Sequence, residues 1–557
     1  MVKLALVMGG GVSLGSYISG ALYELLFALA TNKKTGVEIE VLTGASAGSM
    51  TAALVARALL HDPSLRANLR TAWVEEIDIR NLLEEDAPSQ SIALLSERKI
   101  RELADRMLLP PDPTAASVAP YCADPLRMAF TLSNLEGTPY KIAYNNRPSD
   151  EFATVLHSDW QVFELPKAPS GSQTSTLRET WIAIKESALA SGAFPFAFAP
   201  KYVSRKRGDY ANAALPSDPD RLDILCTDGG TFNNEPLGIA KDLVERNPEH
   251  RKHEYRYIVI DPYLSATAYR NYVPPDSLNL VEFGKRLVSV ILGESVAHDW
   301  LRVNKVNKRL EFERQFIPLV ADLIARLPNS DVTTLKDALR GLSGRIARFK
   351  VAVSARAEPS SDAVARYLEA NTSRIRDDPT LRTVTAARNL AGEPDRSEVL
   401  ENTVFVLENV AGLRDKETMD LYLIAPQDDE LAGNFMFNFG GFFRREWRDH
   451  DFRKGRKHAR KLIEQSLLDC VEYDPEPAGN DDPYNPPPLG AVGTQSFTER
   501  ERTVLREALD KRFDRVLSLL GLKWFQKGLV NWLLRGQVYR LLGLETPAGQ
   551  GSGGMEV

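Results

Sequence analysis

The chain has 557 residues, of which 43% are hydrophobic and 26% charged, and its formal net charge is −6. This composition is typical of a soluble globular protein with two or three domains, and the small negative charge argues against a dedicated nucleic-acid-binding protein, which would be basic. The three cysteines, Cys122, Cys226 and Cys470, are far apart and lack C-x-x-C spacing, which argues against a disulfide framework and favours a reducing compartment.

The first predicted elements are a buried strand at Leu4–Met8 and a helix over residues 16–30, joined by a loop that begins with Gly9, Gly10 and Gly11. The apolar start is too short for a typical signal peptide, and no run of about 18 apolar residues predicts a membrane span. A glycine loop before a helix exposes backbone N–H groups that bind an anion. Two ligands fit this pattern, a dinucleotide pyrophosphate and the oxyanion of acyl transfer.

The second predicted strand, Val37–Thr43, bears on the choice between these ligands. A dinucleotide site needs an acidic residue at the far end of this strand, but Glu38 and Glu40 lie at its start. Its far end leads into Gly44-Ala45-Ser46-Ala47-Gly48, a G-x-S-x-G sequence followed at once by a helical pattern. Strand, sharp turn and helix are the context of a nucleophile elbow. The sequence therefore favours acyl transfer, with a nucleotide-dependent oxidoreductase as an alternative.

Further strands are predicted downstream. The alternating runs Met128–Ser133 and Tyr140–Tyr144 predict a hairpin, and Ile224–Thr227 and Tyr257–Ile260 predict short buried strands. Hydrophobic strands joined by helices indicate an α/β domain with a parallel sheet covered by helices on both faces.

An aspartate followed by two glycines, Asp228-Gly229-Gly230, comes directly after the predicted strand Ile224–Thr227. By itself this motif is an ordinary turn. Because the carboxyl ends of parallel strands meet at one edge of a sheet, we expect Asp228 at the same edge as Ser46 and the glycine loop.

Long helical patterns dominate after about residue 274, over 277–326, 333–356, 360–376 and 497–543. We expect three parts: an α/β domain at 1–270, a mainly α-helical C-terminal domain at 271–545 and a flexible tail at 546–557. The basic stretch 444–461 contains Arg448 and Arg456, either as contacts for anionic lipid headgroups or as parts of a solvated helix face. Residues 524–544 suit either a membrane interface or a core helix.

Three motifs, Gly9–Gly11, Gly44–Gly48 and Asp228–Gly230, occur together with the stretches Ser187–Pro195 and Asn233–Pro236 in an order that resembles the patatin-like phospholipase family. The resemblance covers about residues 1–265 and implies a patatin-like fold and a lipid acyl hydrolase of the phospholipase A or lysophospholipase type. The chain is similar to a bacterial subgroup with a long C-terminal helical extension. Family members usually carry Arg or Lys shortly after the triple glycine, whereas this chain has Val-Ser-Leu-Gly there.

The resemblance implies catalysis by a Ser46–Asp228 dyad, without a metal or another cofactor. In this mechanism Asp228 accepts the Ser46 proton. The oxyanion is held by backbone amides of the residues Gly9, Gly10, Gly11 and Ala47. The motifs are completed by the glycines Gly44, Gly48, Gly229 and Gly230. A Ser–His–Asp triad is the alternative, but none of the seven histidines sits at a clear strand end after the acid.

The expected partner is a phospholipid or another acyl lipid. Nucleic acid is not expected as a partner. We expect a cytoplasmic protein, with peripheral contact to a membrane as an open alternative and the oligomeric state left open. A catalytically weak protein of the same fold that binds lipid or a partner is the other function to be tested.

Overall fold

The structure of the protein, a computed structural model, describes residues 1–84, 93–114, 117–143, 151–167, 174–210, 213–215, 220–264, 280–355, 358–414, 416, 418–427, 430–477, 481–519, 535 and 539. The strands are β1 Val2–Met8, β2 Val37–Gly44, β3 Cys122–Ala143, β4 Glu151–Leu165, β5 Lys201–Lys206, β6 Arg221–Asp228, β7 Glu254–Ile260 and β8 Asp420–Ile424. The helices are α1 Gly15–Ala30, α2 Ala47–Leu60, α3 Ala67–Arg70, α4 Ile79–Leu82, α5 Arg98–Leu108, α6 Thr174–Ser191, α7 Leu237–Glu245, α8 Leu280–Arg326, α9 Asn329–Ala355, α10 Ser361–Asp377, α11 Pro379–Ala387, α12 Pro394–Ala411, α13 Phe435–Asn438, α14 Arg445–Ser466 and α15 Glu499–Leu519.

The chain forms two compact units. The first contains residues 1–299 together with 420–557, and the second contains residues 300–419. The first unit is α/β, and the chain after residue 270 is mostly helical, as the sequence predicts. The expected division at residues 270 and 545 stays a prediction, and the two units divide the chain differently because residues after 420 return to the first unit.

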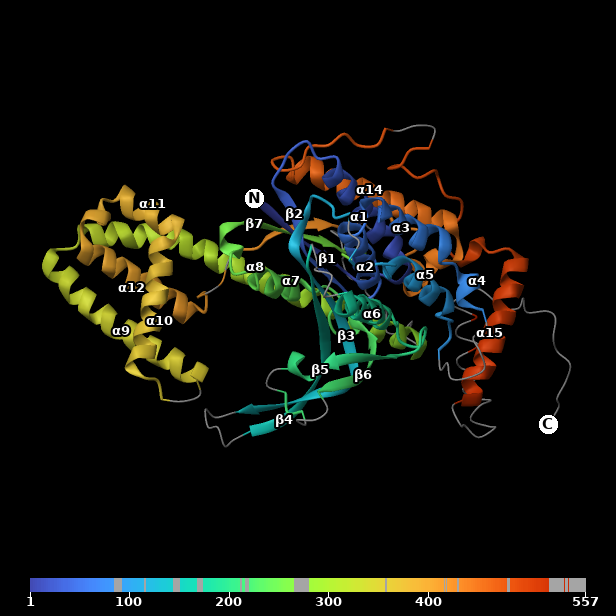
Figure 1. Ribbon diagram of the computed structural model, residues 1–557, viewed down its shortest axis with the longest axis horizontal. Helices are drawn as coiled ribbons and strands as arrows, with labels where there is room; N and C mark the ends of the chain where they lie inside the picture. The colour runs from blue at the N-terminus through green and yellow to red at the C-terminus, as the bar shows by residue number, and fades with distance from the viewer. Residues whose placement is uncertain are drawn as a thin grey trace. The chain divides into compact units, whose positions relative to one another are not determined.

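One eight-stranded sheet forms the centre of the first unit, in the order β5-β6-β3-β2-β1-β7-β8, with β4 paired to β3 (Figure 1). The pairs β1–β2, β1–β7, β2–β3 and β7–β8 are parallel, whereas β3–β4, β3–β6 and β5–β6 are antiparallel. The strands β1 and β2 are buried along nearly their whole length, and apolar residues predominate in both, although β2 carries Glu38 and Glu40 in its first half.

The predicted hairpin within residues 128–144 is wrong. Residues 128–133 and 140–143 both belong to β3, and the hairpin partner is β4; Tyr144 lies outside the described residues. Between Ser133 and Thr138 the register shifts, with Gly137 at φ 76° and the Asn134 side chain accepting hydrogen bonds from the amides of residues 136 and 137. The glycine therefore forms a bulge that bends a long strand, where the sequence predicts a turn that reverses the chain.

The helix α1 packs against α14, so the C-terminal part of the chain helps to build the core of the first unit (Figure 1). A Cβ on Gly20 would lie 2.0 Å from the backbone oxygen of Phe452, and a Cβ on Gly455 would lie 2.1 Å from the backbone oxygen of Tyr17. Only glycine allows the two helices to approach this closely. Residues 12–30 are long and apolar enough to cross a membrane, but 89% of that window is buried inside the described structure.

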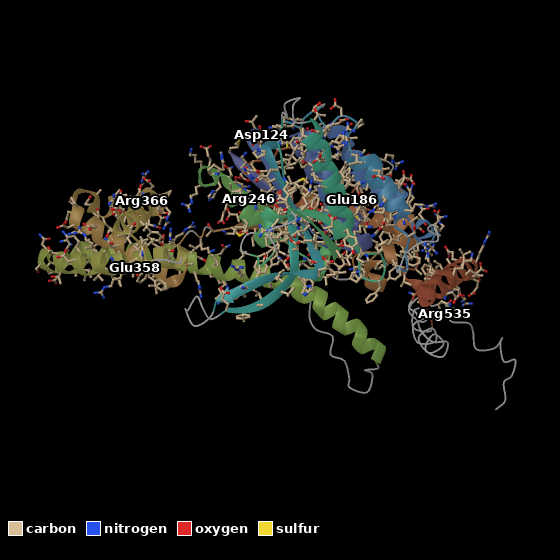
Figure 2. All side chains as sticks on the ribbon, turned by 60° about the horizontal axis from the view of Figure 1, so that its bottom comes forward. Asp124, Glu186, Arg246, Glu358, Arg366 and Arg535 are labelled. Atoms are coloured by element: carbon tan, nitrogen blue, oxygen red, sulfur yellow. The ribbon has the colours of Figure 1, made fainter. Side chains whose placement is uncertain are left out.

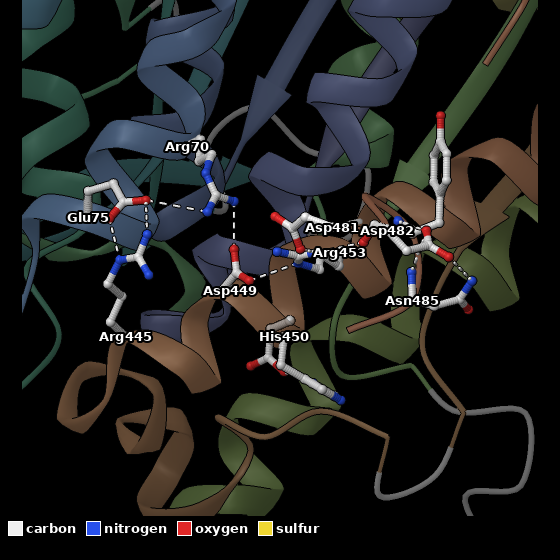
Figure 3. A network of polar contacts seen from close by, with 11 residues as sticks. Arg70, Glu75, Arg445, Asp449, His450, Arg453, Asp481, Asp482 and Asn485 are labelled. Atoms are coloured by element: carbon white, nitrogen blue, oxygen red, sulfur yellow. Dashed lines mark hydrogen bonds and ion pairs between the residues drawn. The ribbon is translucent and has the colours of Figure 1, made fainter. Parts of the chain in front are cut away.

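A network of ion pairs fastens α14 to the N-terminal half (Figure 3). Asp449 forms an ion pair with Arg70 at 2.6 Å and accepts a hydrogen bond from Arg453 at 2.8 Å. Arg453 also pairs with Asp481 at 2.6 Å, and Arg445 pairs with Glu75. The ion pairs of Asp449 with Arg70 and of Arg445 with Glu75 thus hold α14 against the segment that follows α2.

The second unit is a helical assembly with its own core, formed by α9–α12 and the second half of α8 (Figure 1). Ser360 caps α10 by accepting from the Ala363 amide at 3.2 Å, which satisfies one of the free N–H groups of the first turn. Charged side chains such as Glu358 and Arg366 are exposed on the outside of this unit (Figure 2).

Candidate active site

Ser46 lies at a sharp turn between β2 and α2. Its backbone has φ 52° and ψ −123°, a conformation that L-residues rarely adopt, and its side chain is 5% exposed. The Ser46 amide donates to Ser191 Oγ at 2.9 Å, and Ser191 Oγ also lies 2.8 Å from Ser49 Oγ. A Cβ on Gly48 of α2 would lie 2.4 Å from the backbone oxygen of Met8, the last residue of β1, so β1 and α2 meet too closely for any other residue at this position. The local geometry is that of a strained nucleophile elbow.

Asp228 is the hydrogen-bond partner of Ser46. Ser46 Oγ donates to Asp228 Oδ2 at 2.5 Å, and Asp228 Oδ1 accepts from the Gly230 amide at 2.8 Å. The backbone oxygen of Asp228 accepts from Ser133 Oγ at 2.7 Å, and its backbone nitrogen donates to Ala193 at 3.0 Å. The residue is 2% exposed: its carboxylate is held by Ser46 and the Gly230 amide, and its backbone by β3 and by the loop after α6.

Asp228 lies at the same edge of the sheet as Ser46, as expected, but the strand that carries it is antiparallel to its neighbour and not parallel. β6 runs antiparallel to the long strand β3 and pairs Asp228 with Leu132, while Gly44 at the end of β2 pairs with Phe130 of the same strand. β3 extends beyond the parallel part of the sheet, and β6 pairs with this extension. The last residue of β6, Asp228, therefore lies beside the turn at Ser46.

Burial raises the pKa of Asp228 from the ordinary 3.8 to about 7, although the hydrogen bonds from Ser46 and Gly230 act in the opposite direction. A carboxylate with this pKa is a stronger base than an ordinary aspartate, and it is still partly ionised at neutral pH. This answers the main chemical objection to a dyad, which is that an aspartate of pKa about 4 is a poor base toward a hydroxyl.

No histidine hydrogen-bonds to Ser46 or Asp228 within the described residues. His157, on β4, uses Nδ1 in a 2.7 Å contact with the backbone oxygen of Asn134, and its ring stacks on Phe232 at 6.2 Å. A Ser–His–Asp triad is therefore not assembled in this part of the chain. The residues that the structure describes contain no cluster of three or more histidine, cysteine, aspartate or glutamate side chains that could hold a metal ion.

The glycine loop passes directly over Ser46. The Gly9 amide donates to Ile260 at 2.9 Å, and the Gly10 amide contacts the backbone and side-chain oxygens of Asn234 at 3.3 and 3.2 Å. A Cβ on Gly10 would lie 2.2 Å from the Asn234 side-chain oxygen and 3.2 Å from Ser46 Cβ. The first two glycines therefore permit close approach, and their amides already have partners.

Two other predicted donors differ from these glycines. In the portion of the chain that the structure describes, the amides of Gly11 and Ala47 donate to no protein acceptor. Ala47 is the first residue of α2, whose first amides have no partner within the helix. Both amides are thus available to a ligand oxygen.

An acidic residue that sequence reasoning missed lies behind the loop. Asp261 follows β7 directly and is fully buried; a Cβ on Gly9 would lie 2.6 Å from its Oδ2. Burial raises the pKa of Asp261, and hydrogen bonds from Glu235 and the Tyr263 and Leu264 amides oppose this rise. Its position after a buried strand, Tyr257–Ile260, was the signal that could have found it.

An apolar hollow opens beside Ser46. It is narrow, with a cavity volume of about 30 Å³. Its lining is mostly apolar and consists of Val12, Ser46, Ala47, Met50, Trp73, Ile77, Ile100, Gly192, Phe194, Phe198 and Phe442. A second apolar hollow shares Met50, Trp73, Ile77 and Ile100 and continues between α2, α5 and α6. The serine therefore lies at the end of an apolar path.

The two arginines singled out in the basic stretch are not surface groups. Arg448 is 1% exposed and donates to the backbone oxygens of Val74, Gly441 and Phe442. Arg456 is buried and pairs with Glu24 at 2.7 Å. For Arg448 and Arg456 both alternatives, headgroup contacts and a solvated helix face, are wrong, because the two side chains are held inside the protein. Residues 524–544 lie outside the described residues apart from 535 and 539.

Comparison with known proteins identifies the family of the domain in which these residues lie. Residues 6–241 match the profile of the family described as Patatin-like phospholipase, a span that contains both Ser46 and Asp228. This domain belongs to the patatin-like phospholipase family. The members of the family are in general lipid acyl hydrolases.

Two curated relatives extend the comparison beyond the patatin-like domain. The chain is 22% identical over 379 residues to the uncharacterized protein y4iI of Sinorhizobium fredii, covering 52% of this chain and 53% of that protein. It is 22% identical over 378 residues to the uncharacterized membrane protein Rv3479 of Mycobacterium tuberculosis, covering 59% of this chain and 34% of that protein. The chain thus spans about half the length of the first and a third of the second.

Proposed function

We propose that the protein is a serine ester hydrolase that cleaves acyl esters of phospholipids or related lipids, of the phospholipase A or lysophospholipase type, through Ser46 and Asp228. The observation that carries this proposal is the 2.5 Å hydrogen bond between Ser46 Oγ and Asp228 Oδ2 at a strained elbow. The family of the domain supports a lipid substrate.

The mechanism begins with transfer of the Ser46 proton to Asp228 as Oγ attacks the ester carbonyl. The negative charge that develops on the carbonyl oxygen is stabilised by two free amides, that of Gly11 in the glycine loop and that of Ala47 at the N-terminal end of α2. Asp228 then returns the proton to the departing alcohol, leaving the acyl group on Ser46. Water, deprotonated by Asp228, hydrolyses this acyl-enzyme and restores both side chains. A positioned base contributes about 10²–10⁴ in rate, and each oxyanion donor about 10²–10³.

The lining of the narrow hollow beside the nucleophile is mostly apolar, which is consistent with a lipid ester and less so with a polar one. We further propose a cytoplasmic protein that reaches its lipid at a membrane surface by peripheral contact. Nucleic acid is not an expected partner, because the formal net charge is −6.

The test is hydrolysis of phosphatidylcholine and lysophosphatidylcholine in vesicles, measured by release of free fatty acid. The variants Ser46→Ala and Asp228→Asn should lose at least about a hundredfold in turnover. Asp223→Asn is the matched control, since Asp223 lies on the same strand, β6, but is exposed. Residual turnover of Ser46→Ala within a few-fold of the parent would exclude Ser46 as nucleophile. A parent protein that binds vesicles but hydrolyses neither lipid would favour the binding-protein alternative.

A further inference from the structure

A short segment far along the chain touches the oxyanion loop. Residues 438–443, here called the aromatic segment, have the sequence Asn-Phe-Gly-Gly-Phe-Phe; they begin at the last residue of α13 and end just before α14. Ser13 Oγ donates to the backbone oxygen of Asn438 and accepts from the Gly441 amide at 3.0 Å. A Cβ on Gly441 would lie 2.7 Å from Ser13 Oγ, so the two segments meet with no room for a side chain.

The loop that this contact holds is strained. Val12, directly before Ser13, has φ 52°, and a β-branched residue adopts that conformation only at a cost. Asn438 on the other side of the contact has φ 64°. Such conformations persist only where surrounding contacts fix them. The fully buried hydroxyl of Ser13, with a donor and an acceptor in the aromatic segment, supplies such contacts.

Arg448 fixes the aromatic segment in turn. Its guanidinium donates to the backbone oxygens of Gly441 at 3.0 Å and Phe442 at 3.1 Å, and to Val74 at 2.9 Å. A buried guanidinium is tolerated only when its N–H groups have partners. Because Val74 belongs to the π-helical turn Thr71–Glu76, the arginine ties the aromatic segment to the turn that supplies Trp73 to the hollow beside Ser46.

The aromatic segment also forms part of the wall of that hollow. Phe442 lines it together with Ser46, and Phe439 contacts Phe194 of the same hollow edge-to-face at a centroid distance of 5.5 Å. The segment therefore reaches the candidate site twice, through the loop that would hold the oxyanion and through the wall that an acyl chain would meet.

We propose that the aromatic segment is part of the active site, with Ser13 as a positioning residue for the oxyanion loop and Phe442 as a residue that determines acyl-chain specificity. This inference rests on the proposed ester hydrolysis. It assigns to the C-terminal part of the chain a role in the reaction, and it offers an anchor for a glycine loop that carries no basic side chain among residues 12–15.

The first experiment tests Ser13. Ser13→Ala removes both contacts, and Ser19→Ala is its matched control, because Ser19 is buried on α1 and its hydroxyl donates, among the described residues, to the Ser16 backbone oxygen alone. With p-nitrophenyl butyrate, Ser13→Ala should lower kcat about tenfold to a hundredfold with little change in KM. Titration with a fluorophosphonate should still label every molecule, only more slowly, and the pH midpoint should not move.

The second experiment tests Phe442. Phe442→Leu should change the ratio of kcat/KM for p-nitrophenyl palmitate to that for the butyrate at least about fivefold. Phe452→Leu is the control, since Phe452 is a buried phenylalanine of α14 that contacts Tyr23. This variant should have the same ratio as the parent.

The outcomes separate this inference from the proposed function. A parent protein that neither hydrolyses esters nor reacts with the fluorophosphonate overturns both. An active parent whose Ser13→Ala variant behaves like Ser19→Ala, or loses labelling stoichiometry while the remaining sites react at the parental rate, overturns the positioning role alone. A ratio unchanged in Phe442→Leu overturns the specificity role.

Discussion

The raised pKa of Asp228 makes a specific prediction about the dependence of the reaction on pH. If Asp228 must be ionised to accept the Ser46 proton, reactivity should rise with pH through a single midpoint at about 7. About a tenth of the carboxyl groups would be ionised at pH 6 and about a hundredth at pH 5, with rates in proportion. An aspartate with its ordinary pKa of about 4 would keep nearly the full rate at pH 5.

The assay is the rate of covalent labelling by a fluorophosphonate between about pH 5 and pH 9, read by intact mass so that the readout does not itself titrate. A histidine would give a similar midpoint, so the measurement is repeated at two temperatures. Ionisation of a carboxyl group has little enthalpy and its midpoint stays in place, whereas that of an imidazole moves. A rate that stays flat down to pH 5, or a midpoint that shifts with temperature, would refute the assignment of Asp228 as the base.

Three further outcomes are expected. Asp228→Asn should gain stability relative to the parent as pH rises from about 4 to 8. Folding raises the pKa of Asp228 from 3.8 to about 7, so its ionisation lowers the unfolding free energy of the parent by about 4 kcal/mol above pH 7 and by nothing below pH 3.8. An equal difference in melting temperature between variant and parent at both pH values would contradict this. Gly10→Ala should reduce ester turnover about a hundredfold through its clash with Asn234, while Gly341→Ala, which meets nothing within 4 Å, should retain parental turnover; equal activity of the two variants would show that the close approach is unimportant. Gly20→Ala should lower the free energy of unfolding by about 1–3 kcal/mol by separating α1 from α14, seen as a lower melting temperature, and an unchanged transition would speak against that packing.

The local features of the fold could be predicted from the sequence, because they depend on neighbouring residues. The strand before Ser46, the turn and the helix after it show in the alternation of apolar residues and in the spacing of Gly44 and Gly48. The long helices α8, α9 and α10 begin and end within a few residues of their predicted limits, since amphipathic periodicity over many turns is a strong signal.

What could not be predicted depends on contacts between distant parts of the chain. The residues in and around Asp420–Ile424 do not indicate that this segment pairs with β7 as an edge strand. Likewise, the residues around Gly441 do not indicate that it contacts Ser13. The buried positions of Arg448 and Arg456 reverse the usual expectation for a basic stretch, because partners some 370 to 430 residues away satisfy them. The sequence predicts a chain reversal at Gly137 where the structure has a bulge, because glycine is favoured in both.

The most direct test of the central claim is to identify the residue that forms a covalent bond. The protein is treated with a fluorophosphonate, digested, and analysed by mass spectrometry for the modified peptide. We predict one adduct per chain, on Ser46, that is absent from Ser46→Ala and forms at least about a hundredfold more slowly in Asp228→Asn. An adduct on another residue, or labelling of Ser46 at the parental rate in Asp228→Asn, would contradict the assignment of Ser46 and Asp228 as nucleophile and base.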